Sequence, residues 1–337
     1  MTSARKKHYA AERLHRATRT VSALLSFWLP APRDVKDTAA VGRVTEVAGF
    51  GSNPGGLRML VYAPARLPPD APLIVVLHGC QQDAAGFAAN AGWLALARRL
   101  RCALVLPEQT AENNRGRCFN WHRPADARRG GGEAKSIRQM VSVATKRYRS
   151  DRRRGFVVGL SAGGAMAVAL LAAYPAVFAA GAAVAGMPVG TASTSAMALL
   201  RMYRADPYRS RGALAAAVQA ALPARSTRSW PRLSIWQGGR DRTVNPANAE
   251  ALAAQWTALH GFDALPTSET VPRPGILRRS WGKPTRPAVE LWTLTAIGHG
   301  FPVDPRRADG GCEGPWVVSA GLSAAHHIAA FWGIDRL

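Results

Sequence analysis

A chain of 337 residues and 35.9 kDa, 47% hydrophobic and 19% charged, is long enough to bury a large core, and its composition excludes a disordered chain, a collagen and a coiled coil. Its 44 basic and 21 acidic residues give a net charge of +23, carried mostly by arginine. Such a charge attracts polyanions, but the basic residues are scattered and lack zinc-finger spacing or an RNP-like aromatic motif, so we expect no specific nucleic-acid partner.

A basic extension precedes the predicted domain. Residues 1–20 carry six basic residues against the single acidic Glu12, and the apolar run 21–29 follows. The two stretches resemble the charged and hydrophobic regions of a signal peptide, but the first is long, the second is short and no clean A-x-A cleavage site follows directly. We therefore expect an amphipathic or loosely ordered extension over 1–40 and one catalytic domain over 41–337. Secreted, periplasmic and cytoplasmic locations stay open.

Predicted strands and helices alternate through the domain. In chain order we expect a strand over 73–77, a helix over 86–100, a strand over 103–106, a helix over 133–148, a strand over 156–160, a turn over 161–164, a helix over 165–174, a strand over 179–185, a strand over 233–236, a helix over 248–260, a strand over 289–295 and a closing helix over 319–331. Segments 109–132 and 263–288 are expected to leave the sheet. The alternation predicts an α/β fold with a doubly wound, mostly parallel sheet and helices on both faces.

One stretch has a composition similar to that of a membrane-spanning segment. The 46 residues between Arg154 and Arg201 carry no charge, which is more than twice the length of a membrane-spanning helix. However, a Gly-rich turn at 161–164 and Pro175 divide this stretch into the strand, helix and strand just described. We therefore expect buried elements of a soluble sheet and no transmembrane segment.

The predicted strand over 156–160 leads into the pentapeptide Gly159-Leu160-Ser161-Ala162-Gly163. A G-x-S-x-G between a strand and a helix is the signature of a nucleophile elbow, in which a sharp turn exposes the serine at the carboxyl end of the sheet. The glycines avoid clashes between the strand and the helix. We therefore predict that Ser161 is a catalytic nucleophile, near a helix N-terminus that favours developing negative charge.

A serine nucleophile needs a histidine base oriented by a carboxylate, in the chain order Ser, acid, His for this kind of fold. Asp241 lies in a short Gly-rich loop directly after the strand over 233–236 and is the predicted acid. Its alternative role is to cap the next helix or to pair with Arg240 or Arg242.

Eight histidines compete for the role of base. His299 follows the strand over 289–295 on a loop flanked by glycines, from which an imidazole can reach the serine, so we predict that it is the base. His260, His326 and His327 lie within or at the end of predicted helices and are expected to be surface or packing residues. The other four precede the serine in the chain.

A serine that attacks a carbonyl carbon also needs donors for the oxyanion of its tetrahedral intermediate. The backbone N–H of Ala162, directly after the nucleophile, is the first predicted donor. The loop after the strand over 73–77 supplies the second, which we assign to the N–H of Cys80, with Gln81 as the nearby alternative and a candidate substrate contact. We expect His78 to order this loop.

The four cysteines, at 80, 102, 118 and 312, form no CxxC pair and have no histidine at zinc-finger spacing, so no structural metal site is expected. Disulfide pairing and redox compartment are left undecided by these spacings alone.

Several motifs together resemble one known family. They are LHGCQQ (77–82), PEQ (107–109), CFNWH (118–122), RRGGGEAKSI (128–137), GLSAGGAMA (159–167), YPAVFAAGAAVAGMPVG (174–190) and GGRDRTVNP (238–246). This set is similar to the polyhydroxybutyrate (PHB) depolymerase family of α/β-hydrolase esterases, over about residues 42–335. The resemblance implies serine carboxylester hydrolysis through an acyl-enzyme, with no metal or organic cofactor, and Ser161, Asp241 and His299 fall on the triad positions.

The resemblance also carries finer expectations. Trp121 falls on the aromatic of the C-x-N-W segment that lines the substrate groove, and Cys80 with Cys118 is the candidate disulfide pair. Many members continue after the histidine with a Trp-Ser-Gly-Gly-type stretch, whereas this chain has FPVDP (301–305), so the groove is expected to differ there. Many secreted members also carry a separate polymer-binding domain, which this chain has no room for, so avid adsorption to crystalline polyester is not expected.

The expected substrates are short-chain esters, including 3-hydroxybutyrate oligomers or amorphous polymer. The alternative within the same chemistry is a feruloyl or acetylxylan esterase, because the loops 109–132 and 263–318 would set acyl and alcohol specificity. The alternative of another class is a polyanion-binding protein on a hydrolase scaffold. The oligomeric state is not predicted.

Overall fold

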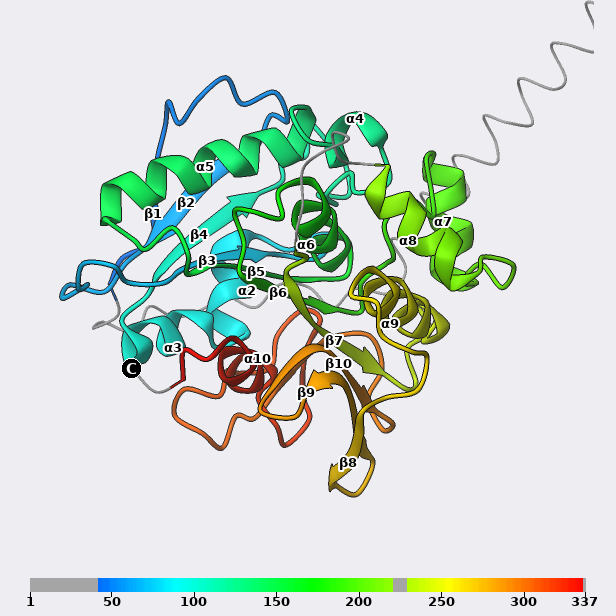
Figure 1. Ribbon diagram of the computed structural model, residues 1–337. Helices are drawn as coiled ribbons and strands as arrows, with labels where there is room; N and C mark the ends of the chain where they lie inside the picture. Colours follow the sequence, from blue (N-terminus) through cyan, green and yellow to red (C-terminus); the bar gives the residue numbers. More distant parts are fainter. Residues whose placement is uncertain (1–41, 221–228, 336–337) are drawn as a thin grey trace, which may run out of the picture. The chain divides into compact units, whose positions relative to one another are not determined.

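A single large sheet runs through the computed structural model, which describes residues 42–220 and 229–335 (Figure 1). The expectation for the extension over 1–40 therefore lies outside the described residues. The sheet contains, in spatial order, β1 (Thr45–Glu46), β2 (Arg58–Tyr62), β4 (Ala103–Glu108), β3 (Leu73–Leu77), β5 (Gly155–Leu160), β6 (Ala180–Val184), β7 (Arg232–Gly238), β10 (Arg286–Leu294), β9 (Ile276–Lys283) and β8 (Ser268–Arg273). A separate parallel pair joins β11 (Phe301–Val303) to β12 (Val317–Ser319).

The centre of the sheet, from β4 to β10, is parallel, and the strands at both edges are antiparallel. Every residue of β3, β5 and β6 is buried. Strands that are buried on both faces read as continuous apolar runs, which is why LIVVL and FVVGL were recognisable in the sequence. The predicted α/β fold with a mostly parallel sheet is confirmed.

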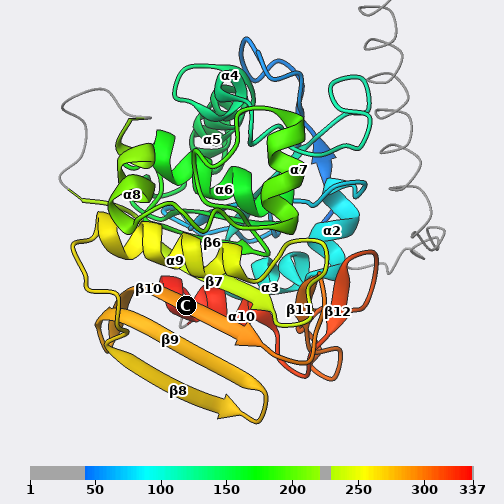
Figure 2. The ribbon, with the colours of Figure 1, turned by 90° about the vertical axis from the view of Figure 1, so that its right-hand side faces the viewer.

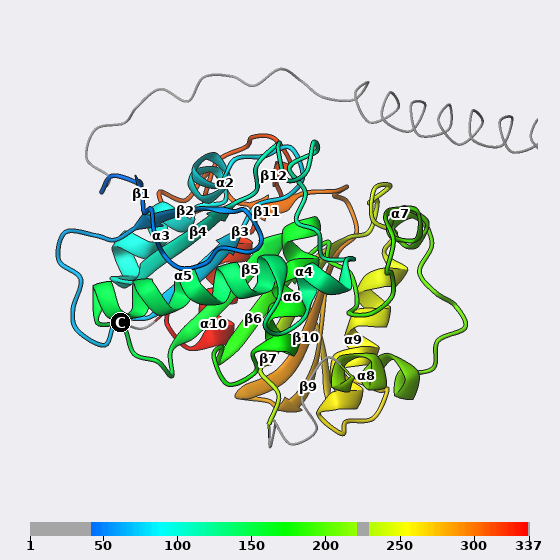
Figure 3. The same cartoon turned by 90° about the horizontal axis from the view of Figure 1, so that it is seen from above.

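Helices cover both faces of the sheet. On one face lie α5 (Gly132–Tyr148), α6 (Ala162–Ala173) and α9 (Ala247–Leu259), and on the other lie α2 (Ala84–Asn90), α3 (Trp93–Leu100) and α10 (Ala324–Trp332). Figure 3 looks down on the first face, where α5 and α6 lie over the central strands. Three further helices, α4 (Pro124–Ala127), α7 (Ser195–Tyr203) and α8 (Arg211–Gln219), follow other connections (Figure 2).

Each face has its own apolar core. Ile137, Val168 and Leu252 pack with Val157 on the α5 side, whereas Trp332 stacks on Phe156 with 4.8 Å between ring centroids on the α10 side. The two cores hold the central strands in fixed register, so the loops at their carboxyl ends start from rigid positions.

Three sequence predictions were wrong in detail. The helix predicted over 86–100 is divided into α2 and α3, because Gly92 adopts φ 82° and approaches the backbone of Gly311. The closing helix begins at Ala324, because residues 317–319 pair as β12. The segment 263–288 does not leave the sheet: β8 and β9 extend its edge as antiparallel strands.

The uncharged stretch 155–200 folds into β5, α6, β6 and the first part of α7. None of the helices in the described ranges combines the length and apolarity needed to cross a membrane.

Candidate active site

Ser161 connects β5 directly to α6 in a strained turn. Its backbone has φ 56° and ψ −119°, a combination that costs a non-glycine residue about 1–3 kcal/mol. A Cβ on Gly159 would overlap the carbonyl of Gly163, and a Cβ on Gly163 would overlap the carbonyls of Leu77 and His78. The turn is therefore possible only with glycine at these two positions. The helix begins at Ala162 rather than at 165 as predicted, so Ser161 is its N-cap residue.

Asp241 and His299 lie against each other. The Nδ1 atom of His299 is 2.7 Å from Oδ2 of Asp241, and both side chains are almost completely buried. The other carboxylate oxygen, Oδ1, accepts the backbone N–H groups of Thr243 and Val244 at 2.8 and 2.9 Å, and Gln237 donates to Oδ2 at 3.0 Å. These donors fix the carboxylate, which in turn fixes the imidazole ring with Nδ1 toward Asp241.

The topology brings the three predicted triad residues to one edge of the sheet. Ser161 follows β5, Asp241 follows β7 and His299 follows β10, and these strands run parallel in the order β5-β6-β7-β10. The carboxyl ends of parallel strands meet at the same edge, which is where ligands bind in open α/β sheets.

A chain of contacts links the histidine to the nucleophile loop. The His299 ring packs edge-on against Trp316 with 5.6 Å between centroids. The adjacent Pro315 carbonyl accepts a hydrogen bond from Gln82 Nε2 at 2.5 Å, and Gln82 Oε1 accepts the N–H of Gly79 at 2.7 Å. Gly79 in turn contacts Leu160, the residue before the serine. His299 and Ser161 therefore border the same loop.

The loop over 78–82 carries Cys80 and Gln81, the two candidates for the second oxyanion donor. The N–H of Gln81 donates to the carbonyl of Gly116 at 2.8 Å, so the alternative donor is already engaged. Within the described ranges, the N–H of Cys80 donates to no protein acceptor. Ala162 is the first residue of α6, and the first N–H groups of a helix have no partner inside it. The N–H groups of Cys80 and Ala162 are thus both free of a protein acceptor in the described ranges, and their role as oxyanion donors stays a prediction.

His78 orders this loop, as predicted. Its Nδ1 lies 2.7 Å from the carbonyl of Gly79, and its Nε2 accepts the N–H of Gln109 at 3.1 Å. One ring nitrogen donates and the other accepts, which defines a neutral imidazole. Complete burial lowers the pKa of His78, consistent with this neutral form.

The three histidines expected to be surface or packing residues, His260, His326 and His327, have contacts of that kind. His327 packs against Trp292, His260 stacks on Phe262, and His326 lies 3.0 Å from Asp309.

A disulfide joins Cys80 to Cys118 and confirms the pair that the family resemblance implied. It ties the oxyanion loop to the segment 109–132, and the Gln81 contact with Gly116 reinforces the connection. Cys102 is a buried thiol whose pKa burial raises to about 12, and Cys312 is an exposed thiol.

The number of reactive thiols before and after reduction tests this disulfide. In unfolded, unreduced protein, Ellman's reagent should find two reactive thiols, Cys102 and Cys312, because the other two cysteines are linked. After reduction with dithiothreitol the count should rise to four. Four thiols before reduction would show that Cys80 and Cys118 are free.

A buried glutamate that sequence reasoning missed organises the segment 109–132. Glu133 is fully buried, and its Oε1 accepts the side-chain amides of Gln109 and Asn120 at 2.6 and 2.7 Å. Its Oε2 accepts the backbone N–H of Asn120 at 2.8 Å. Asn120 lies between Cys118 and Trp121, so Glu133 holds the segment that carries both. The sequence signal was an acidic residue after three glycines, next to a segment rich in Arg, Gly and Asn.

Glu133 should make stability depend on pH. Burial raises its pKa to about 7 from an ordinary value of 4.5, although its amide donors oppose this shift. The folded state therefore binds this proton more tightly than the unfolded state, so the stabilisation is complete below about pH 4.5 and is lost as pH rises through about 7. Between these pH values, the unfolding free energy of the wild type should fall by up to about 3 kcal/mol relative to that of Glu133→Gln.

Urea unfolding from pH 4 to 8 measures this difference. The exposed Glu112 lies in the segment that Glu133 organises, and Glu112→Gln is the matched control. The difference between the unfolding free energies of the wild type and Glu112→Gln should stay constant with pH. A constant difference for Glu133→Gln as well would mean that the amide donors keep the carboxylate at its ordinary pKa.

An apolar surface lies beside the nucleophile. Ala165, one turn along α6 from Ser161, forms a buried cluster with Met187 and Val244. Trp121 and Met202 pack on this cluster. A cavity of about 100 Å³ is lined by Trp121 and Ala165 and extends along α6 to Ala172. Trp121 therefore lines a cavity along α6, and its role as a residue of the substrate groove stays a prediction. Gln81 is half-buried, and its backbone rather than its side chain makes the contacts described above.

Trp316 is an aromatic residue of the site that sequence reasoning missed. It has φ 55° and packs against His299, between the paired strands β11 and β12. The stretch 301–305, which departs from the family pattern, contains β11. Because β11 pairs with β12, which directly follows Trp316, this stretch places Trp316 next to His299.

Across the described ranges, no group of three or more His, Cys, Asp or Glu side chains is arranged to hold a metal ion.

Comparison with known proteins shows which family the sequence resembles. The sequence profile described as "Esterase PHB depolymerase" matches residues 59–272. Poly(3-hydroxyalkanoate) depolymerase C of Paucimonas lemoignei is 38% identical over 303 residues, which cover 88% of this chain and 72% of that one. Feruloyl esterase B of Talaromyces stipitatus is 29% identical over 289 residues, covering 83% and 76% of the two chains.

Among solved structures, the acetyl xylan esterase from Aspergillus awamori superposes with a TM-score of 0.74 at 22% identity, over 87% of this chain and 100% of that one. At this level of identity the likeness shows a shared α/β-hydrolase fold.

Proposed function

This chain belongs to the PHB depolymerase family of esterases and is a carboxylester hydrolase, and on that premise we propose that Ser161, His299 and Asp241 form its catalytic triad. The observation that carries the proposal is the 2.7 Å contact between His299 Nδ1 and Asp241 Oδ2, at the sheet edge where the strained turn at Ser161 also lies. With Nδ1 committed to the aspartate, Nε2 is the ring nitrogen left to accept the proton of the serine.

The reaction proceeds through an acyl-enzyme. Ser161 Oγ attacks the ester carbonyl while His299 Nε2 accepts the hydroxyl proton, and Asp241 stabilises the imidazolium that forms. The N–H groups of Cys80 and Ala162 stabilise the oxyanion. As the tetrahedral intermediate collapses, the C–O bond to the alcohol breaks and His299 protonates the leaving oxygen. Water then attacks the acyl-enzyme, gives its proton to His299, and releases the acid with the serine restored.

The surface beside this edge favours an apolar ester. The cluster under Trp121 consists of apolar side chains, and Arg128 is the charged residue among the described residues that line the adjoining cavity along α6. Helix α7 continues this surface, because His122 Nε2 lies 3.1 Å from Ser195 Oγ and Met202 packs on the same cluster. The outer side of α7 exposes Leu200 and Tyr203, at 52% and 59%. Exposed apolar side chains next to a groove mark a surface that binds an apolar partner. We therefore propose oligo- and poly(3-hydroxybutyrate) in its amorphous form as the preferred substrate class.

A panel of esters tests this preference. The purified chain should hydrolyse p-nitrophenyl butyrate and 3-hydroxybutyrate oligomers with a kcat/KM at least about tenfold above that for methyl ferulate or acetylated xylan, because a short alkyl acyl chain matches an apolar groove, whereas xylan is polar and ferulate carries a phenol hydroxyl on a bulky ring. Faster turnover of ferulate or acetylxylan would instead assign the chain to the substrate class named for its more distant relatives.

The role of α7 needs a variant that spares the triad. Leu200→Ser should lower the rate of degradation of amorphous polymer particles by a few-fold and leave p-nitrophenyl butyrate hydrolysis unchanged. Leu265→Ser is the matched control, since Leu265 is 81% exposed and lies outside α7. Equal effects of the two variants on the polymer would remove α7 from the proposal.

A further inference from the structure

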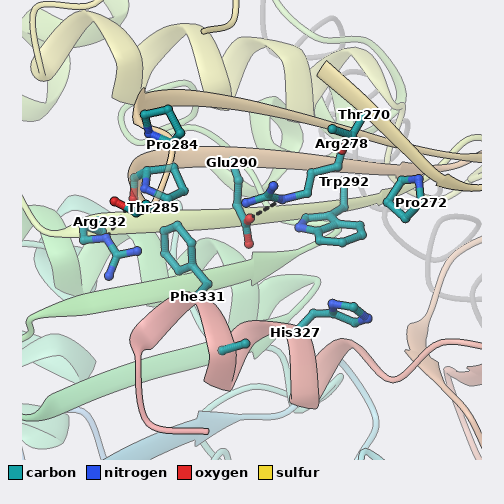
Figure 4. Close-up of a pocket in the computed structure, with 12 residues that line it drawn as sticks. Arg232, Thr270, Pro272, Arg278, Pro284, Thr285, Glu290, Trp292, His327 and Phe331 are labelled. Carbon is teal, nitrogen blue, oxygen red and sulfur yellow. Dashed lines mark hydrogen bonds and ion pairs between the residues drawn. The ribbon is translucent and has the colours of Figure 1, made fainter. Parts of the chain in front are cut away.

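A second cavity lies on the opposite face of the sheet from α6. It has a volume of about 330 Å³ and is bounded by α10 and by strands β7, β9 and β10 (Figure 4). Arg232 at the start of β7 and Pro287 near the start of β10 line it, so the cavity reaches toward the amino ends of the parallel strands. The proposed triad lies at their carboxyl ends.

Two arginines present guanidinium groups to this cavity. The Arg232 Cζ lies 4.2 Å from the ring centroid of Phe331, and the Arg278 Cζ lies 5.5 Å from that of Trp292. Arg232 Nε donates to the carbonyl of Pro287 at 2.8 Å, and Arg278 Nε donates to Glu290 at 2.9 Å. In residues 42–220 and 229–335, no acceptor pairs with an Nη nitrogen of either arginine. The rings and the Nε contacts therefore hold both groups in place and leave their terminal donors available.

The charges around the cavity do not balance. Of the described residues that line it, Glu290 alone carries a carboxylate, and this carboxylate is already bound by Arg278 and by the Ser234 hydroxyl. Arg232 thus has no anionic partner there. Its partial burial lowers its pKa to about 10, and nearby Arg286 contributes to this. His327 is neutral at pH 7, because burial lowers its pKa to about 4. The lining therefore carries one net positive charge.

We propose that this cavity binds a small organic monocarboxylate with an apolar or aromatic body. A carboxylate matches the planar fork of a guanidinium, and one negative charge balances the lining. Phe331, Trp292 and Pro272 supply apolar walls for the rest of the molecule, and the volume suits a ligand of the size of benzoate. The inference rests on residues outside the proposed triad, so it stands or falls independently of the ester-cleaving mechanism.

Isothermal titration of the full chain with benzoate at pH 7 tests the proposal. We expect saturable binding of one benzoate, with benzyl alcohol, which lacks the charge, and inorganic phosphate, which lacks the apolar body, each binding at least about tenfold more weakly. This comparison needs no variant. Absence of saturable benzoate binding, or phosphate binding as tight as that of benzoate, would overturn it.

Variants then locate the ligand. Arg232→Met should weaken benzoate binding about tenfold or more, and Arg232→Lys, which keeps the charge but not the fork, should weaken it less. Arg147→Met is the matched control, because Arg147 also lies over an aromatic ring, that of Tyr148, but at the end of α5. The affinity of Arg147→Met for benzoate should equal that of the wild type, and thermal unfolding verifies that each variant is folded. Unchanged affinity in both Arg232 variants would place the benzoate elsewhere and refute the site.

Discussion

Replacing Ser161 with alanine is expected to lower kcat for p-nitrophenyl acetate and butyrate by about 10⁴-fold or more while the protein stays folded. Alanine keeps the Cβ of serine, so the strained backbone at φ 56° and its contacts are unchanged. What is lost is the oxygen that forms the acyl bond, and neither the oxyanion donors nor the histidine replaces it. A fluorophosphonate probe should label the wild type at position 161 and leave the variant unlabelled.

Ser150→Ala is the matched control for this loss. Ser150 is as buried as Ser161, at 7% against 8% exposed, and its hydroxyl has no partner among the described residues. It precedes β5 and so lies at the other end of that strand from the nucleophile. The control should retain full activity. Turnover by folded Ser161→Ala within about tenfold of the wild type would show that the reaction does not pass through this serine.

The parts of the site that could be predicted from the sequence are those encoded locally. The turn at Ser161 needs glycines at fixed positions, and Asp241 and His299 each follow a buried strand in a short loop, so chain order and strand polarity sufficed to place them. The disulfide partner of Cys80 came only from family resemblance, because spacing alone allowed other pairings.

The parts that could not be predicted depend on contacts between distant segments. Glu133 lies in the first turn of α5 after three glycines, a position that usually faces solvent, and its burial depends on amides from residues 109–120 folding over it. Trp316 is brought to His299 only when β12 pairs with β11. The hairpin of β8 (SETVPR) and β9 (ILRRSWGK) lies at a sheet edge and shows no regular alternation of polar and apolar residues, so without its partner strand β10 this sequence resembles a loop.

Asp241→Asn should reduce kcat by about 10³–10⁴-fold with little change in KM. The oxygen of the new amide will stay with the N–H groups of Thr243 and Val244, because an amino group there would face two donors. The NH₂ group then replaces Oδ2, loses the hydrogen bond from Gln237 Nε2 and donates to His299 Nδ1. This forces the imidazole proton onto Nε2, the nitrogen that must accept the serine proton, so the base is held in the wrong tautomer.

Nitrogen NMR of His299 separates this explanation from a general loss of structure. In the resting wild type at neutral pH, Nδ1 should carry the proton, and in Asp241→Asn the proton should be on Nε2. Asp151→Asn is the matched control, because Asp151 also accepts the backbone N–H two residues later, that of Arg153, but has no histidine partner. Since its amide can keep that bond, the control should leave both the tautomer and kcat unchanged. If Asp241→Asn kept Nδ1 protonated and still lost activity, the carboxylate would act through charge alone, and orientation of the histidine would not explain its role.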